Sequence, residues 1–486
     1  MDKLLIGKDF SINLNKLNRH GFITGSTGSG KTVTLKVLAE NLAKAGVPVF
    51  LSDIKGDLAS LAEKAELNEE ISQRIEYIGL EEYEPRSFDV ELYDVFSENG
   101  LPLRATISDM GPILLSKLMG LNDIQEGVLN IAFKIADDEG LLLIDTKDLR
   151  AILNLLDERK SELTKDYGNI SSASIGAILR SLLVIEQQGG DKFFGQPEYD
   201  IMDLFRVNSN NEGIINILFA KKLIQFPKLY TTFMLWLLST LYDTLPEVGD
   251  LDKPKMVFFF DEAHLIFETK DKILIDKLEQ IVRLIRSKGV GIFFVTQKTT
   301  DLTDTILSQL GNRIQHSLRA FSPKEQKEVK SIAESFRQTG DIDLAEEILN
   351  LKTGEAIFSV LDENSEPTFA KKALICPPES KLGVVDQVEI MRLINASPLY
   401  GKYAEYIDNE SAFEVLEQRR REQVLEEEKE RAKVEEIKQT KKVEEKVQRK
   451  SNRMSATERF FSNVVSSIGR RVGTEISRGI FGNKRR

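Results

Sequence analysis

Eight consecutive residues near the N-terminus have the types and spacing of a loop that binds phosphate. Residues 25–32 read GSTGSGKT and fit the pattern G-x-x-x-x-G-K-[ST], whose glycines let backbone N–H groups wrap around a phosphate. A short apolar stretch precedes the loop and a helical pattern follows it, so the positive end of a helix dipole adds to the site. We expect Lys31 to reach the β- and γ-phosphates and Thr32 to bind Mg²⁺. The expected nucleotide contacts are Gly25, Ser26, Thr27, Gly28, Ser29, Gly30, Lys31 and Thr32.

Two adjacent carboxylates follow an apolar stretch much later in the chain. Residues 256–260 are all apolar, and Asp261 and Glu262 come directly after them. Such a run predicts a central strand, and ligands bind at the carboxyl ends of strands in an open α/β sheet. We expect Asp261 to hold Mg²⁺ through water and Glu262 to polarise the attacking water as the general base. The acidic second residue favours hydrolysis over transfer to another substrate.

Two other polar residues end apolar stretches, and each has two interpretations. Gln297 follows residues 291–296, where its amide could contact the γ-phosphate or the attacking water, or could simply form a turn. Asp53 follows residues 47–52, where its carboxylate could orient the water shell of the metal or cap the next helix. We include Gln297 among the catalytic candidates as a sensor of the γ-phosphate.

An arginine is expected to complete the chemistry. Phosphoryl transfer in oligomeric motors commonly uses an arginine from the neighbouring subunit. For each arginine near the apolar stretches an ordinary surface ion pair is the alternative, and we expect at least one of the set to act in catalysis. The candidates are Arg283, Arg286, Arg313 and Arg319. We give His264 no catalytic role, because a lone histidine after such a strand is more often a structural or coupling residue.

The composition excludes several other kinds of chemistry. The 486 residues include 66 Lys or Arg and 77 Asp or Glu, which gives a net charge of −11. The single cysteine, Cys376, excludes an intrachain disulfide framework and a cysteine zinc site. Three histidines far apart in sequence argue against a histidine metal centre. No apolar stretch is long enough to span a bilayer, and the N-terminus lacks the pattern of a secretory signal, so we expect a cytoplasmic protein.

The segments that must position these residues alternate between strand and helix. Apolar stretches predict strands at residues 22–24, 47–52, 214–219, 256–260, 291–296, 313–318 and 356–361. Weaker strand candidates lie near residues 75–78 and 103–107. Helices are expected over residues 31–45, 229–245 and 274–287. This alternation predicts an α/β fold with a mainly parallel sheet and helices on both faces, interrupted by a helical insertion over residues 110–205.

Charge is distributed unevenly toward the C-terminus. Residues 411–450 carry 12 basic and 11 acidic side chains, and their spacing favours a solvated helix over a coiled coil. Residues 451–486 carry 8 basic and 2 acidic side chains. One apolar stripe of a helix is predicted there by Phe461, Val465, Ile468, Val472, Ile476 and Ile480. Such a basic amphipathic tail could lie on an anionic membrane, grip nucleic acid, or dock on its own body or another subunit.

With these residues placed, the chain resembles the HerA–FtsK superfamily of P-loop motor ATPases, and within it the bacterial HerA-like ATPases of the YjgR type. The resemblance covers about residues 5–380. It rests on the stretches Gly21–Thr32, Asp53–Leu58, Phe260–His264, Arg283–Gly291 and Leu310–His316. It implies a RecA-like core that uses ATP and Mg²⁺ and assembles as a ring, often of six subunits.

The resemblance also assigns roles by position in the motifs. It gives Lys31 and Thr32 the phosphate-loop roles, Asp261 and Glu262 the Walker B roles, Gln297 the sensor role, and Arg286 the role of a trans-acting arginine. HerA proper carries a β-barrel domain before its phosphate loop, and the 24 residues before Gly25 are too few for one. DNA translocation and partnership with a nuclease therefore do not follow from the resemblance alone.

These observations predict a division of the chain and a function. We expect residues 1–109 and 206–380 to form the ATPase core, residues 110–205 a helical insertion, residues 381–450 a linker with a charged helix, and residues 451–486 a basic tail. The expected function is Mg²⁺-dependent ATP hydrolysis by a homo-oligomeric motor, a hexameric ring that moves duplex DNA as a translocase or helicase. The alternative is an ATP-dependent switch or scaffold that acts on protein partners, or at the membrane surface through the tail.

Overall fold

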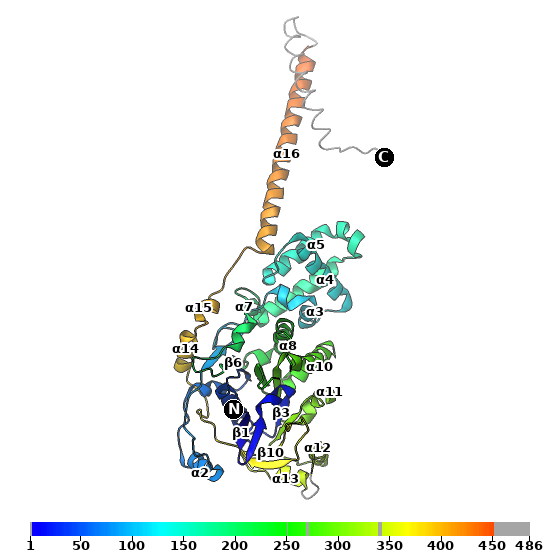
Figure 1. The fold of residues 1–486 in the computed structure, drawn as a ribbon. Helices are drawn as coiled ribbons and strands as arrows, with labels where there is room; N and C mark the ends of the chain where they lie inside the picture. The colour runs from blue at the N-terminus through cyan, green and yellow to red at the C-terminus, as the bar shows by residue number, and fades with distance from the viewer. Residues whose placement is uncertain (1, 250, 269–271, 339–342, 452–486) are drawn as a thin grey trace. The chain divides into compact units, whose positions relative to one another are not determined.

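The structure of the chain, a computed structural model, describes residues 2–249, 251–268, 272–338 and 343–451 (Figure 1). The chain divides into two compact units, residues 1–412 and residues 413–486. The strands of the first unit are β1 (Lys3–Gly7), β2 (Phe10–Asn13), β3 (Gly21–Thr24), β4 (Val49–Asp53), β5 (Val90–Tyr93), β6 (Ile215–Phe219), β7 (Met256–Phe260), β8 (Val290–Thr296), β9 (Asn312–Gln315), β10 (Glu355–Ser359) and β11 (Lys371–Leu374).

Helices occupy most of the chain between these strands. The α-helices are α1 (Lys31–Lys44), α2 (Glu69–Ile78), α3 (Ile107–Met119), α4 (Asp123–Glu139), α5 (Thr146–Tyr167), α6 (Ser172–Ile185), α7 (Asp191–Phe193), α8 (Pro227–Thr244), α9 (His264–Phe267), α10 (Lys272–Ile285), α11 (Asp304–Leu307), α12 (Pro323–Glu334), α13 (Leu344–Asn350), α14 (Gln387–Ala396), α15 (Tyr400–Tyr403) and α16 (Ala412–Ser451). Shorter 3₁₀ turns connect several of them, including Leu58–Ala62 and Arg286–Lys288.

One large sheet organises the first unit. Among the described residues it has nine strands in the order β11–β10–β9–β3–β8–β7–β4–β6–β5. Neighbouring strands from β9 to β5 are parallel, whereas β10 and β11 add antiparallel pairs at one edge. Strands β1 and β2 form a separate antiparallel pair. The predicted α/β fold with a mainly parallel sheet is confirmed.

The central strands are buried on both faces, as their sequences predict. All residues of β7 and β8 are buried, because helices cover both sides of a parallel sheet of this kind. Aromatic rings pack across these strands, with centroids 5.2 Å apart for Phe259 and Phe293 and 5.9 Å apart for Phe260 and Phe294. This packing fixes where the strands end, and their ends carry the candidate site.

Along the sequence, helices α3 to α7 come between β5 and β6, although these two strands are neighbours in the sheet. Figure 1 shows α3, α4 and α5 gathered together in cyan, with α8 between them and the sheet. Side chains at the starts of three of these helices cap backbone N–H groups in capping boxes, from Thr106, Asn122 and Asp145. The sequence therefore sets the helix boundaries within this segment locally.

The ten main strand and helix predictions are confirmed, with boundaries that differ by a few residues at most. Both weaker strand predictions are wrong. Residues 75–78 belong to α2, because Asn68 caps its N-terminus and Gly79, with φ of +81°, ends it. Residues 103–107 make only an isolated bridge at Ala105 before α3 begins. Strands β1, β2, β5 and β11 were not predicted.

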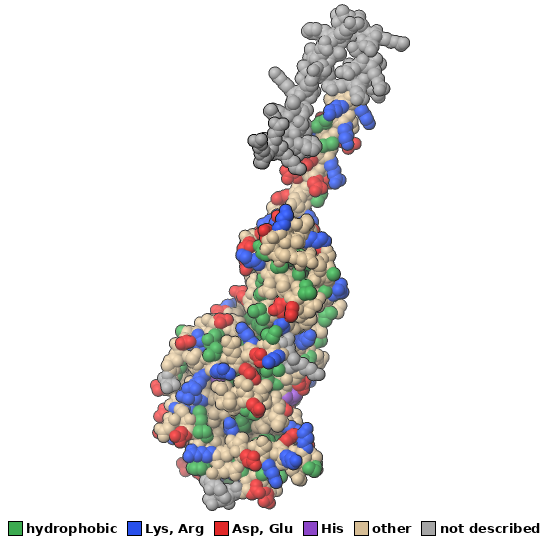
Figure 2. Space-filling model, turned by 90° about the vertical axis from the view of Figure 1, so that its right-hand side faces the viewer, with side chains coloured by type: hydrophobic (Ala, Val, Ile, Leu, Met, Phe, Trp, Pro, Cys, Tyr) green, Lys and Arg blue, Asp and Glu red, His purple; other side chains and the backbone are tan. Residues whose placement is uncertain are grey.

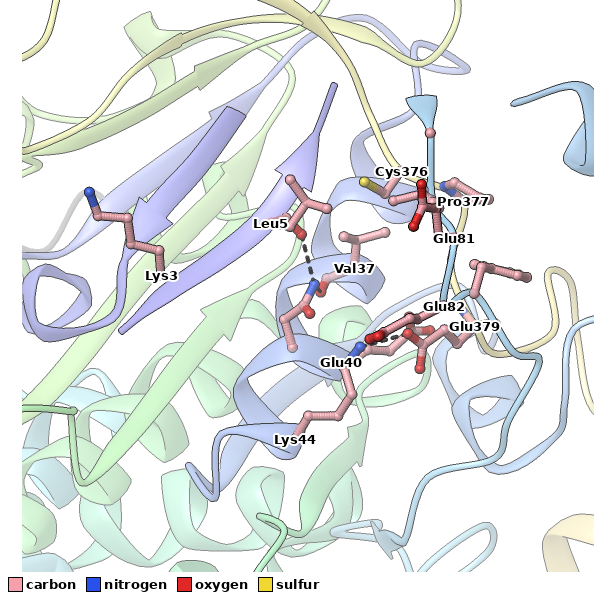
Figure 3. Close-up of a pocket in the computed structure, with 14 residues that line it drawn as sticks. Lys3, Leu5, Val37, Glu40, Lys44, Glu81, Glu82, Cys376, Pro377 and Glu379 are labelled. Carbon is pink, nitrogen blue, oxygen red and sulfur yellow. Dashed lines mark hydrogen bonds and ion pairs between the residues drawn. The ribbon is translucent and has the colours of Figure 1, made fainter. Parts of the chain in front are cut away.

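A segment from the end of the sheet crosses the outer side of α1. This strap, residues 376–381, follows β11 and is tied down by Glu40, whose carboxylate accepts hydrogen bonds from the backbone N–H groups of Glu379 and Ser380 and from the Ser380 hydroxyl. Lys44 Nζ lies 2.6 Å from Glu379 Oε1. Figure 3 shows the pocket of about 440 Å³ beside this crossing, between α1, β1 and the strap. The strap is therefore bound to the phosphate-loop helix through Glu40 and Lys44.

The second unit is described as far as residue 451, in helix α16. Most of its described side chains are exposed. The predicted amphipathic tail lies outside the described residues, apart from its first residue. On the face of the first unit seen in Figure 2, acidic and basic side chains are interspersed.

Among the described residues, no single helix is both long enough and apolar enough to cross a membrane. The segments Thr146–Tyr167 and Ser172–Phe193, bent by 119° relative to each other, meet the criterion together by length and composition only.

Candidate functional site

The strand register brings the candidate residues to one edge of the sheet. Thr24 at the end of β3 pairs with Thr296 at the end of β8, and the ends of β7 and β4 lie alongside in the same direction. Residues that directly follow these four strands therefore meet at the carboxyl edge. They include the phosphate loop, the two carboxylates after β7, Gln297 and Asp53, which the sequence predicts to lie together.

The phosphate loop has the backbone conformation that its glycines permit. Gly25, Gly28 and Gly30 have φ of +154°, +79° and +111°, and Gly30 caps the N-terminus of α1. A Cβ atom at position 25 would lie 2.5 Å from Cβ of His316, so only glycine fits there. The first backbone N–H groups of α1 have no partner within the helix and are available to an anion.

Lys31 is buried and turns back onto the loop that precedes it. Its Nζ donates hydrogen bonds to the carbonyl oxygens of Gly25, at 2.6 Å, and Ser26, at 3.2 Å. Burial lowers the pKa of Lys31, and the positive charge of Lys55 adds to that effect, while Glu262 and Asp261 oppose it. The ammonium group is thus held inside the loop, close enough to the carboxylates after β7 to interact with their charge.

The histidine behind the loop helps to hold its shape. His316 is fully buried, and its Nε2 lies 2.8 Å from the hydroxyl of Thr34 in the first turns of α1. Burial lowers the pKa of His316 to about 4, so the imidazole is neutral at physiological pH. The loop therefore rests on an uncharged, hydrogen-bonded support.

The two carboxylates are buried and lie next to each other. Asp261 Oδ1 accepts a hydrogen bond from the backbone N–H of Glu262 at 3.0 Å. Burial raises the pKa of Asp261 to about 6, and Lys55 opposes this rise. Glu262 has φ of +46°, a left-handed conformation that costs about 1–3 kcal/mol in a residue of this type. Strain of this kind at a carboxylate is typical of functional sites.

Three side chains from different elements surround the carboxylate of Glu262. Gln297 Nε2 donates to Glu262 Oε2 at 3.4 Å, and His264 Nδ1 lies 3.5 Å from the same oxygen. Lys55 Nζ lies 3.3 Å from Glu262 Oε1 and 3.9 Å from Asp261 Oδ2. The structure thus brings Gln297 and Glu262 together, and it also places Lys55 and His264 at the same carboxylate.

The structure favours one of the two interpretations of Asp53. Its carboxylate accepts hydrogen bonds from the backbone N–H groups of Gly56, at 2.7 Å, and Leu58, at 3.0 Å, so it caps the turn that follows β4. Burial raises the pKa of Asp53 to about 7, with Asp57 adding to the effect. Both of its oxygens already accept backbone hydrogen bonds.

The residues present fit a nucleotide with Mg²⁺. The hydroxyl of Ser29 is buried in the loop without a hydrogen-bond partner among the described residues, as a contact awaiting a phosphate would be. Over the same residues, no three His, Cys, Asp or Glu side chains are grouped to hold a metal. Mg²⁺ commonly takes one or two protein oxygens, with phosphate oxygens and water completing the shell. Thr32 and Asp261 are the residues that could supply those oxygens.

The four candidate arginines do not all lie near this edge. Arg286 precedes β8 and lies close enough to His20, just before β3, to lower its pKa. It is therefore at the amino edge, about 20 Å from the carboxyl edge along a seven-residue strand, and cannot reach the loop of its own chain. Arg313 donates to the carbonyl oxygen of Ser335 at 2.7 Å, and the side chains of Arg283 and Arg319 are exposed.

Sequence reasoning did not assign a role to Lys55. Its motif, residues 53–57, was recognised, but the position of its side chain depends on how the turn after β4 folds. The available signal was that Lys55 comes two residues after a strand whose end lies at the carboxyl edge. Roles for all the residues of the site remain predictions.

Comparisons with known proteins agree with this geometry. The family described as helicase HerA-like C-terminal matches residues 3–486. The chain is 23% identical over 377 residues to the DNA double-strand break repair helicase HerA of Sulfolobus acidocaldarius, covering 73% of this chain and 65% of that protein. It is 23% identical over 369 residues to the HerA of Saccharolobus solfataricus, covering 73% and 64%. The chain thus spans slightly less than two thirds of these relatives.

A solved structure shares the fold. The plasmid coupling protein TrwB in complex with ADP and Mg²⁺ superposes with a TM-score of 0.51 at 15% sequence identity, over 80% of this chain and 91% of that one. At this identity the likeness concerns the fold alone.

Proposed function

The chain belongs to the helicase HerA-like C-terminal family, and from this premise we propose that it hydrolyses ATP with Mg²⁺ as one subunit of an oligomeric motor that acts on duplex DNA. The predicted membership of the HerA–FtsK superfamily is confirmed by this match. One observation carries the proposal: Glu262 lies at the carboxyl edge beside Asp261, within hydrogen-bond reach of Gln297, on the same edge as the phosphate loop.

The nucleotide and metal are inferred from the loop and supported by a shared fold. TrwB binds ADP and Mg²⁺ in its solved structure. In this chain the ammonium of Lys31 would neutralise the β- and γ-phosphate oxygens, and Thr32 and Asp261 would hold Mg²⁺. When bound, Mg²⁺ neutralises charge on the phosphate oxygens and helps to orient them.

The remaining residues of the site would act on the attacking water. The carboxylate of Glu262 would accept a proton from that water. The amide of Gln297 would orient this carboxylate through its hydrogen bond to Oε2 and would sense the γ-phosphate. Glu262 is nearly buried, so its interaction with water near the phosphate is screened little by solvent.

Assembly and division of the chain follow from the same proposal. Arg286 lies at the amino edge, out of reach of its own loop, which suits a residue that completes the site of a neighbouring subunit in a hexameric ring. We propose residues 1–109 and 206–380 as the ATPase core, because β5 and β6 are neighbours across the intervening segment 110–205. Residues 381–450 would form the linker and charged helix, and residues 451–486 the basic tail.

A steady-state ATPase assay with and without duplex DNA at low salt tests this function. We expect Glu262→Gln to bind ATP and to lose at least about a hundredfold in turnover, because the amide cannot accept the proton. Glu268→Gln, the same change at a more exposed glutamate six residues later, is the matched control and should turn over normally.

The outcomes separate the candidate functions. Stimulation of several-fold by duplex DNA supports the motor. A rate that is indifferent to DNA favours a switch or scaffold that acts on proteins. Near-native turnover in Glu262→Gln would place the general base elsewhere and overturn the assignment.

A further inference from the structure

Lys55 is the one cation that contacts both carboxylates of the candidate site in the part of the chain described. Its Nζ lies 3.3 Å from Glu262 Oε1 and 3.9 Å from Asp261 Oδ2. The Lys55 side chain is 41% exposed, whereas those of Asp261 and Glu262 are 7% and 12% exposed. A partly exposed lysine that reaches into a buried acidic pair is accessible to a ligand that enters from solvent.

The turn that carries Lys55 is built to hold it at this edge. Asp53 fixes the turn through the N–H groups of Gly56 and Leu58, and Gly56 adopts φ of +81°, which glycine tolerates without strain. The 3₁₀ turn that follows is tied to α1, because the buried Nζ of Lys36 donates to the hydroxyl of Ser60 at 2.7 Å. The base of the Lys55 side chain is thus anchored to the helix that begins at the phosphate loop.

The contacts of Lys55 compete with the role proposed for Glu262. Gln297 and His264 approach Glu262 Oε2, and Lys55 lies at Oε1, so both oxygens of the carboxylate already have partners. Each carboxylate oxygen can accept about two hydrogen bonds, so Lys55 leaves part of Oε1 open, but its positive charge opposes the arrival of a proton there. Because Oε1 is the oxygen near a long flexible side chain, movement of Lys55 is the simplest way to free it.

The charges around the loop indicate where Lys55 would go. The ammonium groups of Lys31 and Lys55 are close enough to interact, and both interact with Glu262. A nucleoside triphosphate on the loop places its terminal phosphate at Lys31, on the side of the edge where Glu262 and Lys55 lie. A terminal phosphate carries two negative charges on one group, so its oxygens would compete with Asp261 and Glu262 for the ammonium of Lys55.

We propose that Lys55 is a second lysine of the nucleotide site. Its ammonium pairs with Glu262 in this structure and moves to contact an oxygen of the γ-phosphate when a nucleoside triphosphate binds. This movement frees Glu262 Oε1 for water only when a γ-phosphate is present. Lys55 therefore discriminates ATP from ADP and couples binding of the third phosphate to the general base. This inference rests on the proposed ATPase function.

Equilibrium binding of two nucleotides separates this role from a structural one. In Mg²⁺, we expect Lys55→Met to weaken binding of the imido analogue of ATP by about tenfold or more, the worth of one charged hydrogen bond, and to change ADP binding by less than about twofold. Lys55→Arg, which keeps the charge, should restore most of the lost affinity. Unchanged ADP affinity also reports that the variant is folded.

A matched control and the opposite outcomes complete the test. Lys134→Met removes the same charge from an exposed lysine paired with Asp138 on α4 and should leave both affinities unchanged. Equal loss for the two nucleotides, or no loss for either, would overturn the role of Lys55. The readout is binding, so it stands apart from the ATPase assay: a chain that discriminates the analogue through Lys55 yet hydrolyses no ATP would refute the proposed function alone.

Discussion

The pH dependence of stability at His20 tests the packing around β3, the strand that leads to the phosphate loop. It precedes β3 and is fully buried between α10 and β8. Its Nε2–H donates to the carbonyl oxygen of Val282 at 2.8 Å, and its Nδ1 accepts from the backbone N–H of Ile292 at 3.0 Å. Only the neutral imidazole can make both bonds, because protonated Nδ1 would face another donor.

The pKa of His20 sets how much the free energy of unfolding changes with pH. Burial lowers the pKa of His20 from its ordinary 6.5 to about 4, and Arg286 adds to this. A folded-state pKa below the unfolded one means that the contribution to stability is complete above pH 6.5 and is lost as the pH falls from 6.5 toward 4. Between pH 7.5 and pH 5 this single group should reduce the free energy of unfolding by about 2 kcal/mol.

Urea unfolding at the two pH values measures this loss. The buried Trp236, the single tryptophan of the chain, provides the fluorescence signal. His20→Asn keeps an acceptor for Ile292 but cannot titrate. The advantage of the native chain over this variant should shrink by about 2 kcal/mol on going to pH 5. Equal losses in the two proteins would refute the argument, since His316 and the carboxyl groups titrate in both.

Two more predictions concern α1 and its loop. Glu40→Ala should lower the free energy of unfolding by about 3 kcal/mol in urea titrations, because the hydrogen-bond donors of Glu379 and Ser380 in the strap lose their acceptor. Glu82→Ala, on the rim of the same pocket (Figure 3), should have little effect. Gly25→Ala should lower the melting temperature more than Gly28→Ala, because the new Cβ meets His316 at 2.5 Å in the first case and no atom within 4 Å in the second. Similar melting temperatures for the two glycine variants would show that the loop can relax around His316.

Much of the sheet could be predicted because its central strands are continuous apolar runs. Burial on both faces requires such runs, as at residues 256–260, and the polar residues after them mark the strand ends. The strands at the sheet edges could not be found in this way, since β5 and β11 are short and carry charged residues. The isoleucines at 75 and 78 suggested a strand, but they are three apart, which is also helical spacing, and Asn68 and Gly79 provide the caps.

Sequence motifs predicted which residues lie together at the carboxyl edge. They did not predict the neighbours whose positions depend on loop conformation. The phosphate loop, Asp261, Glu262 and Gln297 follow strands, and parallel strands bring their carboxyl ends to one edge. Lys55 reaches Glu262 because of the turn capped by Asp53, whose shape depends on tertiary contacts with α1. His264 was interpreted as a structural or coupling residue without a catalytic role, and its Nδ1 lies 3.5 Å from Glu262 Oε2.

The position of β3 has a consequence for synthesis of the chain on the ribosome. Phe22 in β3 pairs with Phe294 on one side and Arg313 on the other, so both neighbours of the phosphate-loop strand are made in the last two fifths of the chain. At about 5–20 residues per second, β3 waits roughly 15–50 s for its partners. Helices α3 to α6, whose contacts are mostly local, can form during that wait, and the nucleotide site is among the last parts of the first unit to mature.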